Sequence, residues 1–262
     1  MENLLRVNDL FGGYGREVVI KGVSFAIKKG EFVGIIGPNG SGKSTLLRLM
    51  SRVLAPQQGG VSFSGSDISR MGFKDLARQV AFVSQDTAIN FSFSVEEVVL
   101  MGRIPHLKRL QSEGKKDLDI AERALSLTDT LGIKEKDIDG ISAGERQRVI
   151  IAKALAQEPV LLLLDEPTSH LDIGHQVQTL DLLKKLNRQN NLTIVMVIHD
   201  LNLASEYCSR IILFDQGKIF KDGVPQEVLT YQNIESVYRT IVIVNKNPLS
   251  LKPYVFLVSK EK

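Results

Sequence analysis

The sequence feature that most constrains the fold is a glycine-rich segment, GPNGSGKS, at residues 37–44. Residues 31–36 before it form a largely apolar run typical of a strand buried in a sheet, and residues 45–53 after it have helical spacing. A strand, a glycine-rich loop and a helix in this order predict a loop that binds phosphate groups. Glycine lets successive backbone N–H groups turn toward the ligand, and the helix N-terminus attracts anions.

Two side chains of this segment have a chemical role in the predicted site. Lys43 would place its ammonium group against the β- and γ-phosphates, and the Ser44 hydroxyl is a hard oxygen ligand suited to Mg²⁺. The alternative, a glycine-rich turn with a surface lysine, is disfavoured by the strand and helix on either side. The predicted nucleotide-binding residues of this segment are Gly37, Pro38, Asn39, Gly40, Ser41, Gly42, Lys43, Ser44 and Thr45.

A second candidate catalytic segment is the pair Asp165 and Glu166, which directly follows the apolar run at residues 160–164. Ligands of open parallel sheets bind at the carboxyl ends of the strands. Asp165 could reach Mg²⁺ through water, and Glu166 could polarise an attacking water as a general base. Considered alone, Asp-Glu-Pro after a strand is most often a turn, so this assignment depends on the phosphate loop upstream.

His199 ends the next apolar run, at residues 192–198. It could contact the γ-phosphate or hold the attacking water in line, which makes it the second candidate catalytic residue. An isolated histidine is more often structural, so this assignment also depends on the other motifs.

Composition excludes several classes of protein. The 262 residues are 43% hydrophobic, which excludes a disordered chain, and the net charge of +3 without a Lys/Arg block does not indicate nucleic-acid binding. The single cysteine, Cys208, cannot form an internal disulfide, so we expect a reducing compartment and a buried, unreactive thiol. No window approaches the ~18 apolar residues of a membrane span, so any membrane role requires other polypeptides.

The pattern of strands and helices predicts three regions. Residues 1–85 and 156–230 alternate apolar strands with helices and are expected to form an α/β core with a mostly parallel sheet. Helical patterns dominate residues 86–155, which we expect to be an inserted helical subdomain. Residues 231–262 form a C-terminal extension whose two short apolar runs favour a small β addition.

These motifs together resemble the ATP-binding cassette of ABC transporters over residues 4–230, in the order found in that family. The resemblance implies an α/β fold of the P-loop NTPase (RecA-like) type, with an N-terminal antiparallel β subdomain and an inserted α-helical subdomain. It also implies ATP and Mg²⁺ as cofactors. The motifs are the phosphate loop at 37–45, Gln85, the segment ISAGERQR at 141–148, Asp165-Glu166, the segment SHLD at 169–172, and His199.

The resemblance implies further roles within one copy of the chain. Tyr14 would stack on the adenine ring, the alternative being a tyrosine in a turn. Gln85 would contact the metal and the attacking water. The implied Mg²⁺ ligands are Ser44, Gln85 and Asp165, the last through water.

The resemblance also implies a head-to-tail dimer in which each ATP is shared between two copies. Ser142, Gly144 and Glu145 would form the signature that meets the γ-phosphate bound to the other copy, and Asp172 would couple the two sites. The family's usual signature is Leu-Ser-Gly-Gly-Gln, so Ala143 adds a methyl group and Glu145 adds a charge that is unfavourable near phosphate. We therefore expect Ser142 and Gly144, more than Glu145, to contact the nucleotide.

Three segments resemble the importers of iron–siderophore complexes, haem and cobalamin: residues 91–106, 168–173 and 197–204. Residues 85–106 would then face the permease, the alternative being internal packing. The implied partners are a second copy of the chain, transmembrane permease subunits and, indirectly, a substrate-binding protein, at the inner face of the cell membrane and without nucleic acid. The competing hypotheses are a soluble ABC ATPase of repair, translation or Fe–S assembly, and a nucleotide-binding scaffold without turnover.

Overall fold

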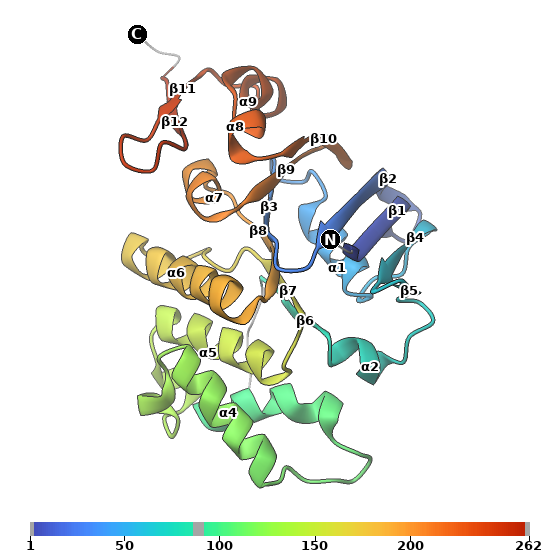
Figure 1. Cartoon of the computed structure of the whole chain (residues 1–262), viewed down its shortest axis with the longest axis vertical. Coiled ribbons are helices and arrows are strands. Elements are labelled where there is room, and N and C mark those ends of the chain that lie inside the picture. Colours follow the sequence, from blue (N-terminus) through green and yellow to red (C-terminus); the bar gives the residue numbers. More distant parts are fainter. Residues whose placement is uncertain (1–2, 86–91, 260–262) are drawn as a thin grey trace. The chain divides into compact units, whose positions relative to one another are not determined.

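The computed structural model describes residues 3–85 and 92–259, and the chain forms two compact units (Figure 1). Unit 1 comprises Met1–Arg70 and Thr193–Lys262, and unit 2 comprises Met71–Leu192. The described part of the predicted helical subdomain lies in unit 2, which also contains two strands and a long helix. Phe91, where the importer-like segment begins, lies outside the described residues.

Unit 1 begins with an antiparallel sheet in the order β2-β1-β4-β5, which confirms the predicted N-terminal β subdomain. The apolar patterns at residues 4–10, 17–20 and 23–27 predict short, separate strands, whereas β1 and β2 form one long hairpin with several register shifts. One shift falls at Gly22, which has φ +69° and lies between the residues paired with Leu10 and Phe11. A glycine in this conformation acts as a bulge, so the ladder continues through it. The strands are β1 (Asn3–Tyr14), β2 (Glu17–Lys28), β4 (Gln58–Phe63) and β5 (Ser66–Asp67).

In the second sheet of unit 1, β3 lies between β8 and β9, and all residues of β3 are buried. β3 runs parallel to both β8 and β9, so the three strands end at the same edge. The β9–β10 hairpin turns at Gln216 and Gly217, both with positive φ, as the pattern at residues 215–218 predicts. The elements are β3 (Phe32–Ile36), α1 (Lys43–Met50), β8 (Thr193–Val197), α7 (Leu201–Tyr207), β9 (Arg210–Asp215) and β10 (Lys218–Gly223).

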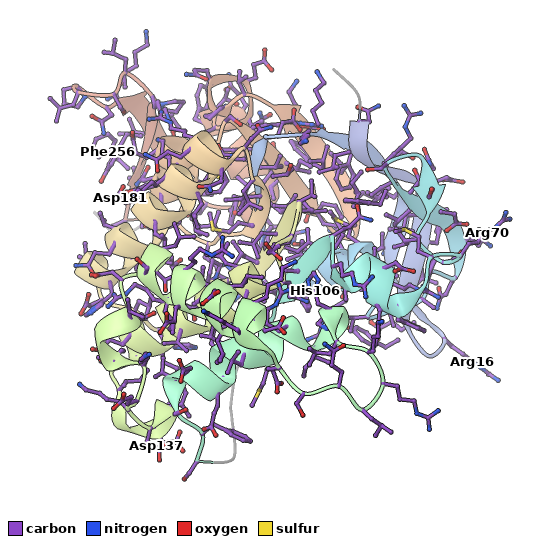
Figure 2. All side chains as sticks on the ribbon, turned by 60° about the horizontal axis from the view of Figure 1, so that its bottom comes forward. Arg16, Arg70, His106, Asp137, Asp181 and Phe256 are labelled. Atoms are coloured by element: carbon purple, nitrogen blue, oxygen red, sulfur yellow. The ribbon has the colours of Figure 1, made fainter. Side chains whose placement is uncertain are left out.

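The C-terminal extension of unit 1 is a helical segment followed by a two-stranded antiparallel sheet, so the predicted β addition is confirmed. Val242 pairs with Leu257 and Lys246 with Pro253. Figure 2 labels Phe256, which lies on the second strand of this hairpin. The elements are α8 (Pro225–Val228), α9 (Tyr231–Tyr238), β11 (Val242–Lys246) and β12 (Pro253–Leu257).

Unit 2 combines the helices α2 to α6 with the parallel strands β6 and β7. Among the residues that the structure describes in either unit, no helix has the length and apolar character required to cross a bilayer. The elements are α2 (Phe73–Ala77), β6 (Val80–Val83), α3 (Val95–Leu100), η1 (Met101–His106), α4 (Lys115–Leu127), η2 (Leu131–Ile133), η3 (Ile138–Gly140), α5 (Ala143–Ala156), β7 (Leu161–Asp165) and α6 (Ile173–Asn190).

Arg103 is a buried ionic centre of unit 2, with a side chain only 2% exposed. Its guanidinium donates to Asp117 Oδ1 at 3.0 Å, to Ala156 O at 2.6 Å and to Glu158 Oε2 at 3.0 Å. Hydrogen bonds from the Gly114 backbone and from Arg103 hold the pKa of Asp117 below its usual value. Arg103 therefore links η1 to α4 and to the end of α5.

This arrangement bears on the segment expected to face the permease. Val98, Val99 and Arg103 are buried within unit 2, and His106, labelled in Figure 2, lies 2.9 Å from Gln157 O through its Nε2. Internal packing, the alternative interpretation, therefore accounts for these residues. Ile104 is 56% exposed and remains available at the surface.

Replacing Arg103 tests the importance of the buried ion pairs. Arg103→Met keeps much of the side-chain volume but leaves the Asp117 carboxylate, itself only 12% exposed, without its cation. We expect the free energy of unfolding to fall by about 3 kcal/mol, the usual cost of removing one partner of a buried pair. Urea unfolding measures it, with the exposed Arg109→Met as a control expected to change stability by less than about 0.5 kcal/mol. Equal stabilities of the two variants would contradict the assignment.

Candidate functional site

The phosphate-loop segment joins β3 to α1 through glycines with positive φ. Gly37 has φ +148°, and a Cβ atom added there would lie 2.1 Å from Phe214 O, so no larger residue fits. Gly40 has φ +75°, and a Cβ added there meets no atom within 4 Å. The loop is thus packed tightly at its base and open at Gly40, where a ligand has room to approach the backbone.

Lys43 lies inside this loop rather than on the surface, at 5% exposure. Its Nζ donates to Gly37 O at 2.9 Å and to Pro38 O at 2.8 Å, so the loop's own carbonyls hold the ammonium group in place. A surface lysine in a turn, the alternative interpretation, is therefore wrong for this residue.

The surroundings of Lys43 suit an anion. The first turn of α1 contains no acidic residue, so the helix N-terminus and the ammonium group add positive potential at one place. The Ser41 hydroxyl is buried and forms no hydrogen bond to any residue that the structure describes. A buried donor of this kind favours a ligand with acceptor oxygens, which a phosphate group provides.

Tyr14 lies at the end of β1, with 46% of its side chain exposed. Its hydroxyl accepts a hydrogen bond of 2.7 Å from Arg48 Nη1, in the helix that follows the phosphate loop. One end of the ring is therefore anchored to α1 in the same unit as the loop. The exposed ring with its anchored hydroxyl is compatible with stacking on a base. The turn that follows Tyr14 is compatible with the alternative, a tyrosine with no role beyond the turn.

His199 is exposed and lies between β8 and α7. The register of β3 on β8 pairs Phe32 with Ile194 and Ile35 with Val197. The carboxyl ends of the two strands therefore coincide, and His199 follows β8 at the edge where the loop follows β3. This is the edge at which ligands of parallel sheets bind.

Gln85 and Glu166 meet in unit 2. β6 and β7 are parallel, with Val83 opposite Leu164, so the residues that follow the two strands lie at one edge. Gln85 Nε2 donates to Glu166 Oε2 at 2.8 Å. The structure thus brings together two of the predicted site residues that are 81 positions apart in the chain.

The backbone at Glu166 has an uncommon conformation. Glu166 has φ +54°, a region that non-glycine residues seldom occupy. The Ser169 N–H and hydroxyl both donate to Glu166 O, at 3.1 and 2.8 Å, and stabilise this turn. The preceding Asp165 is 1% exposed. A strained residue held by its surroundings at the end of a strand is a common feature of functional sites.

The signature segment forms the N-terminus of α5, with Ser142 as the N-cap. Glu145 N donates to Ser142 Oγ at 3.2 Å, and Glu145 Oε2 accepts from the Ser142 N–H at 2.9 Å and from its hydroxyl at 2.8 Å. This is a capping box, and these bonds hold the pKa of Glu145 below its usual value. Glu145 therefore has a structural role at the helix end.

The start of α5 packs against the imidazole of His175, in the first turn of α6. A Cβ atom added at Gly144 would lie 2.1 Å from His175 Cδ2, so only glycine fits against the imidazole. His175 Nδ1 is 2.9 Å from Asp172 Oδ1, and Asp172 is the N-cap of α6. Hydrogen bonds from His175, first from its backbone, hold the pKa of Asp172 below its usual value. Ser142 and Asp172 are both exposed here.

The predicted residues thus form a group in each unit. In unit 1 the phosphate loop and His199 follow parallel strands at the same edge, and Tyr14 is bonded to the helix after the loop. In unit 2 Gln85 contacts Glu166, and Gly144 contacts His175. The bonds of Ser169 to the Glu166 carbonyl and of His175 to Asp172 were not expected from the sequence. The patterns Ser-x-x-Glu at 142–145 and Asp-x-x-His at 172–175 could have indicated the two helix caps.

The candidate Mg²⁺ ligands fit the metal in type. Ser44 supplies a hydroxyl, Gln85 an amide oxygen and Asp165 a carboxylate, all hard oxygen ligands. Over residues 3–85 and 92–259 no group of three or more His, Cys, Asp or Glu side chains could hold a metal ion alone. This agrees with Mg²⁺ chemistry, because that ion is usually held by one or two carboxylates together with water and substrate phosphates.

Comparison with protein families and with known proteins points to the same family. Residues 20–169 match the ABC transporter family. The chain is 39% identical to the ferric enterobactin transport ATP-binding protein FepC of Escherichia coli (strain K12), over 96% of this chain and 93% of the relative.

Two solved structures also resemble the chain over most of its length. An inward-facing metal-chelate type ABC transporter has a chain that is 28% identical with a TM-score of 0.87, covering 99% of both chains. A dimeric ATP-binding cassette bound to ADP and phosphate is 30% identical with a TM-score of 0.72, covering 84% of this chain and 98% of that one. These likenesses confirm the predicted fold class. Together with the family match, they show that this chain belongs to the ABC transporter family, as an ATP-binding subunit that hydrolyses ATP.

Proposed function

We propose that this chain is the ATP-hydrolysing subunit of an importer for a metal chelate, the class that includes iron–siderophore complexes, haem and cobalamin. The observation that carries the proposal is the likeness over 96% of the chain to the ATP-binding protein of ferric enterobactin transport. The metal-chelate type transporter, whose chain resembles this one over 99% of its length, supports the same class. Neither of these two likenesses favours the alternative, a soluble ABC ATPase of repair, translation or Fe–S assembly.

Nucleotide binding is assigned to the phosphate loop. The backbone N–H groups around Gly40 and the N-terminus of α1 would surround the phosphates, while Lys43 exchanges its two bonds to loop carbonyls for phosphate oxygens. The Tyr14 ring would stack on adenine. When bound, Mg²⁺ would neutralise part of the phosphate charge, and Ser44, Gln85 and Asp165 are the residues proposed to hold it.

Hydrolysis is assigned to Glu166 and His199. The 2.8 Å bond from Gln85 and the turn held by Ser169 restrict the orientation of the Glu166 carboxylate. Such restriction suits a general base, because the water it activates has to be aligned with the γ-phosphate. His199 would contact the γ-phosphate or hold the same water, and it is exposed and so accessible to a ligand.

The complete site is proposed to require a second copy of the chain. Ser142 and the N–H groups that begin α5 would approach the γ-phosphate on the other copy, and Asp172 would couple the two sites. The Ser142 N–H and hydroxyl, which donate to Glu145 in the capping box, would exchange that carboxylate for phosphate oxygens, as Lys43 would exchange its carbonyls. In a two-fold pair each copy provides one loop and one signature, so the arrangement is self-consistent.

The pair is proposed to act at the inner face of the cell membrane, on permease subunits supplied by other polypeptides. Ile104, exposed on η1, is a candidate contact because the neighbouring residues of this segment pack internally. A substrate-binding protein would deliver the chelate from the other side.

The role of Lys43 is tested by Lys43→Ala. We expect ATP affinity to fall about 100-fold or more, because charge-assisted hydrogen bonds to phosphate contribute about 1.5–3 kcal/mol each. Titration with a fluorescent ATP analogue measures it. Lys29→Ala, which removes an exposed lysine from the turn before β3, is the matched control and should bind normally. Normal affinity in Lys43→Ala would refute the assignment of the loop.

The role of Glu166 and the need for two copies are tested together by Glu166→Gln. The substitution keeps the hydrogen-bonding shape but removes the base, so ATP hydrolysis should fall by about 10²–10⁴ while ATP stays bound. Size-exclusion chromatography with light scattering should then show a dimer with ATP and a monomer without it. The exposed Glu113→Gln should behave like the unmodified protein. Unchanged turnover, or a monomer at saturating ATP, would contradict the proposal.

Membrane assembly is tested by purifying the complex from native membranes with a tag on this chain. The proposal predicts a co-purifying polytopic permease and ATPase activity stimulated by a binding protein loaded with a metal chelate. Recovery of the tagged chain without any membrane protein, or stimulation by a ligand that contains no metal, would contradict it.

A further inference from the structure

The helix that follows His199 has a well-defined start. Asp200 is the N-cap of α7, and its Oδ1 accepts hydrogen bonds from the backbone N–H groups of Asn202 at 2.8 Å and Leu203 at 2.9 Å. His199 immediately precedes this cap. The position and direction of the first turn of α7 therefore determine where the His199 backbone lies.

Strand β12 of the C-terminal hairpin packs beside α7 (Figure 1). Asn202 Oδ1 accepts from Val255 N at 2.7 Å, and Asn202 Nδ2 donates to Val255 O at 3.2 Å. One side-chain amide thus satisfies both backbone groups of a residue on β12. Such two-point pairing fixes orientation as well as distance, in the way that a neighbouring strand would.

Two further bonds continue the contact along the helix. The Ser205 hydroxyl, on a residue 1% exposed, donates to Pro253 O at 2.7 Å, and Lys252 Nζ donates to Glu206 O. Asn202, Ser205 and Glu206 lie three and four positions apart, which places them on one side of α7. A whole side of the helix is therefore hydrogen-bonded to β12 and the residue before it.

The two ends of α7 are supported differently. At its C-terminal end, Cys208 packs directly on β3, because a Cβ atom added at Gly34 would lie 2.7 Å from Cys208 Sγ. Close contact of this kind leaves the C-terminal end of α7 little freedom to move relative to β3. At its N-terminal end, residues 199–202 border a cavity of about 270 Å³ that is also lined by Ile234 and Tyr238. The cavity leaves the N-terminal end of α7 with fewer packing contacts, so its position depends more on the hydrogen bonds between Asn202 and β12.

The extension also reaches the phosphate loop. The Tyr238 hydroxyl, at the end of α9, is buried beside the backbone of Gly37, and burial raises the pKa of Tyr238 to about 12 against a smaller opposing effect of Gly37. Residues 231–259 therefore contact both the first residue of the loop and the helix that begins after His199. These are the two places in unit 1 to which ATP chemistry is assigned.

We propose that the hairpin β11–β12 is a positioning element for His199, and that Asn202 is the residue through which it acts. This inference rests on the proposed role of His199 in hydrolysis. Small displacements of a group that meets the reacting atoms lower the rate strongly. A hairpin attached to the start of α7 therefore influences turnover without touching the nucleotide.

The test compares Asn202→Ala with Asn245→Ala, measuring steady-state ATP hydrolysis per nucleotide-binding site in each. Asn202→Ala removes both bonds to Val255, whereas Asn245 is exposed on β11 of the same hairpin. We expect kcat to fall about threefold to tenfold in Asn202→Ala with an unchanged KM for ATP, the effect of about one or two hydrogen bonds. Asn202→Asp, which retains the acceptor for Val255 N, should restore part of the rate. Asn245→Ala should match the unmodified protein.

A double-mutant cycle with His199→Ala separates positioning from general stability. If Asn202 acts through His199, Asn202→Ala causes no further loss of kcat in the His199→Ala background. Independent, multiplicative losses, or an unchanged kcat in Asn202→Ala alone, would overturn the inference and leave the proposed function intact. Normal hydrolysis by His199→Ala would instead overturn the proposed role of His199 and this inference with it.

Discussion

The proposed activity depends on one electrostatic interaction, the attraction of a triphosphate to Lys43 and the glycine-rich loop between β3 and α1. Three glycines with positive φ, Gly37, Gly40 and Gly42, shape the loop, and Lys43 is held at its centre by the carbonyls of Gly37 and Pro38. A buried ammonium group in the first turn of a helix that has no acidic residue there is well placed to bind an anion. The parallel strands beside β3 matter because they bring His199 to the same edge of the sheet.

Helix N-termini recur as the building blocks of the other functional segments. The signature begins at the N-cap Ser142, the Asp172 motif is the N-cap of α6, and α7 begins at the cap that follows His199. Each cap fixes the start of its helix and, with it, the position of the functional residue at or next to the cap. This explains why Glu145 is tolerated where the family usually has glutamine, since a carboxylate completes the capping box equally well.

Sequence patterns predict the locally determined features and miss those that depend on distant partners. The phosphate loop, β3 and the Gln216–Gly217 turn follow from short-range rules of glycine geometry and strand burial. The burial of Arg103 could not be predicted, because its partners Asp117 and Glu158 are 14 and 55 positions away. The same holds for the pairing of Asn202 with Val255 over 53 positions, which no periodicity indicates.

The most direct test of the central claim is a structure of the Glu166→Gln variant with ATP and Mg²⁺. We expect a dimer in which the γ-phosphate lies between Lys43 of one copy and Ser142 with the start of α5 of the other. Lys43 should then have left the carbonyls of Gly37 and Pro38 for the phosphate oxygens. A triphosphate bound elsewhere, or a loop in which Lys43 keeps both carbonyl bonds at saturating ATP, would contradict the account.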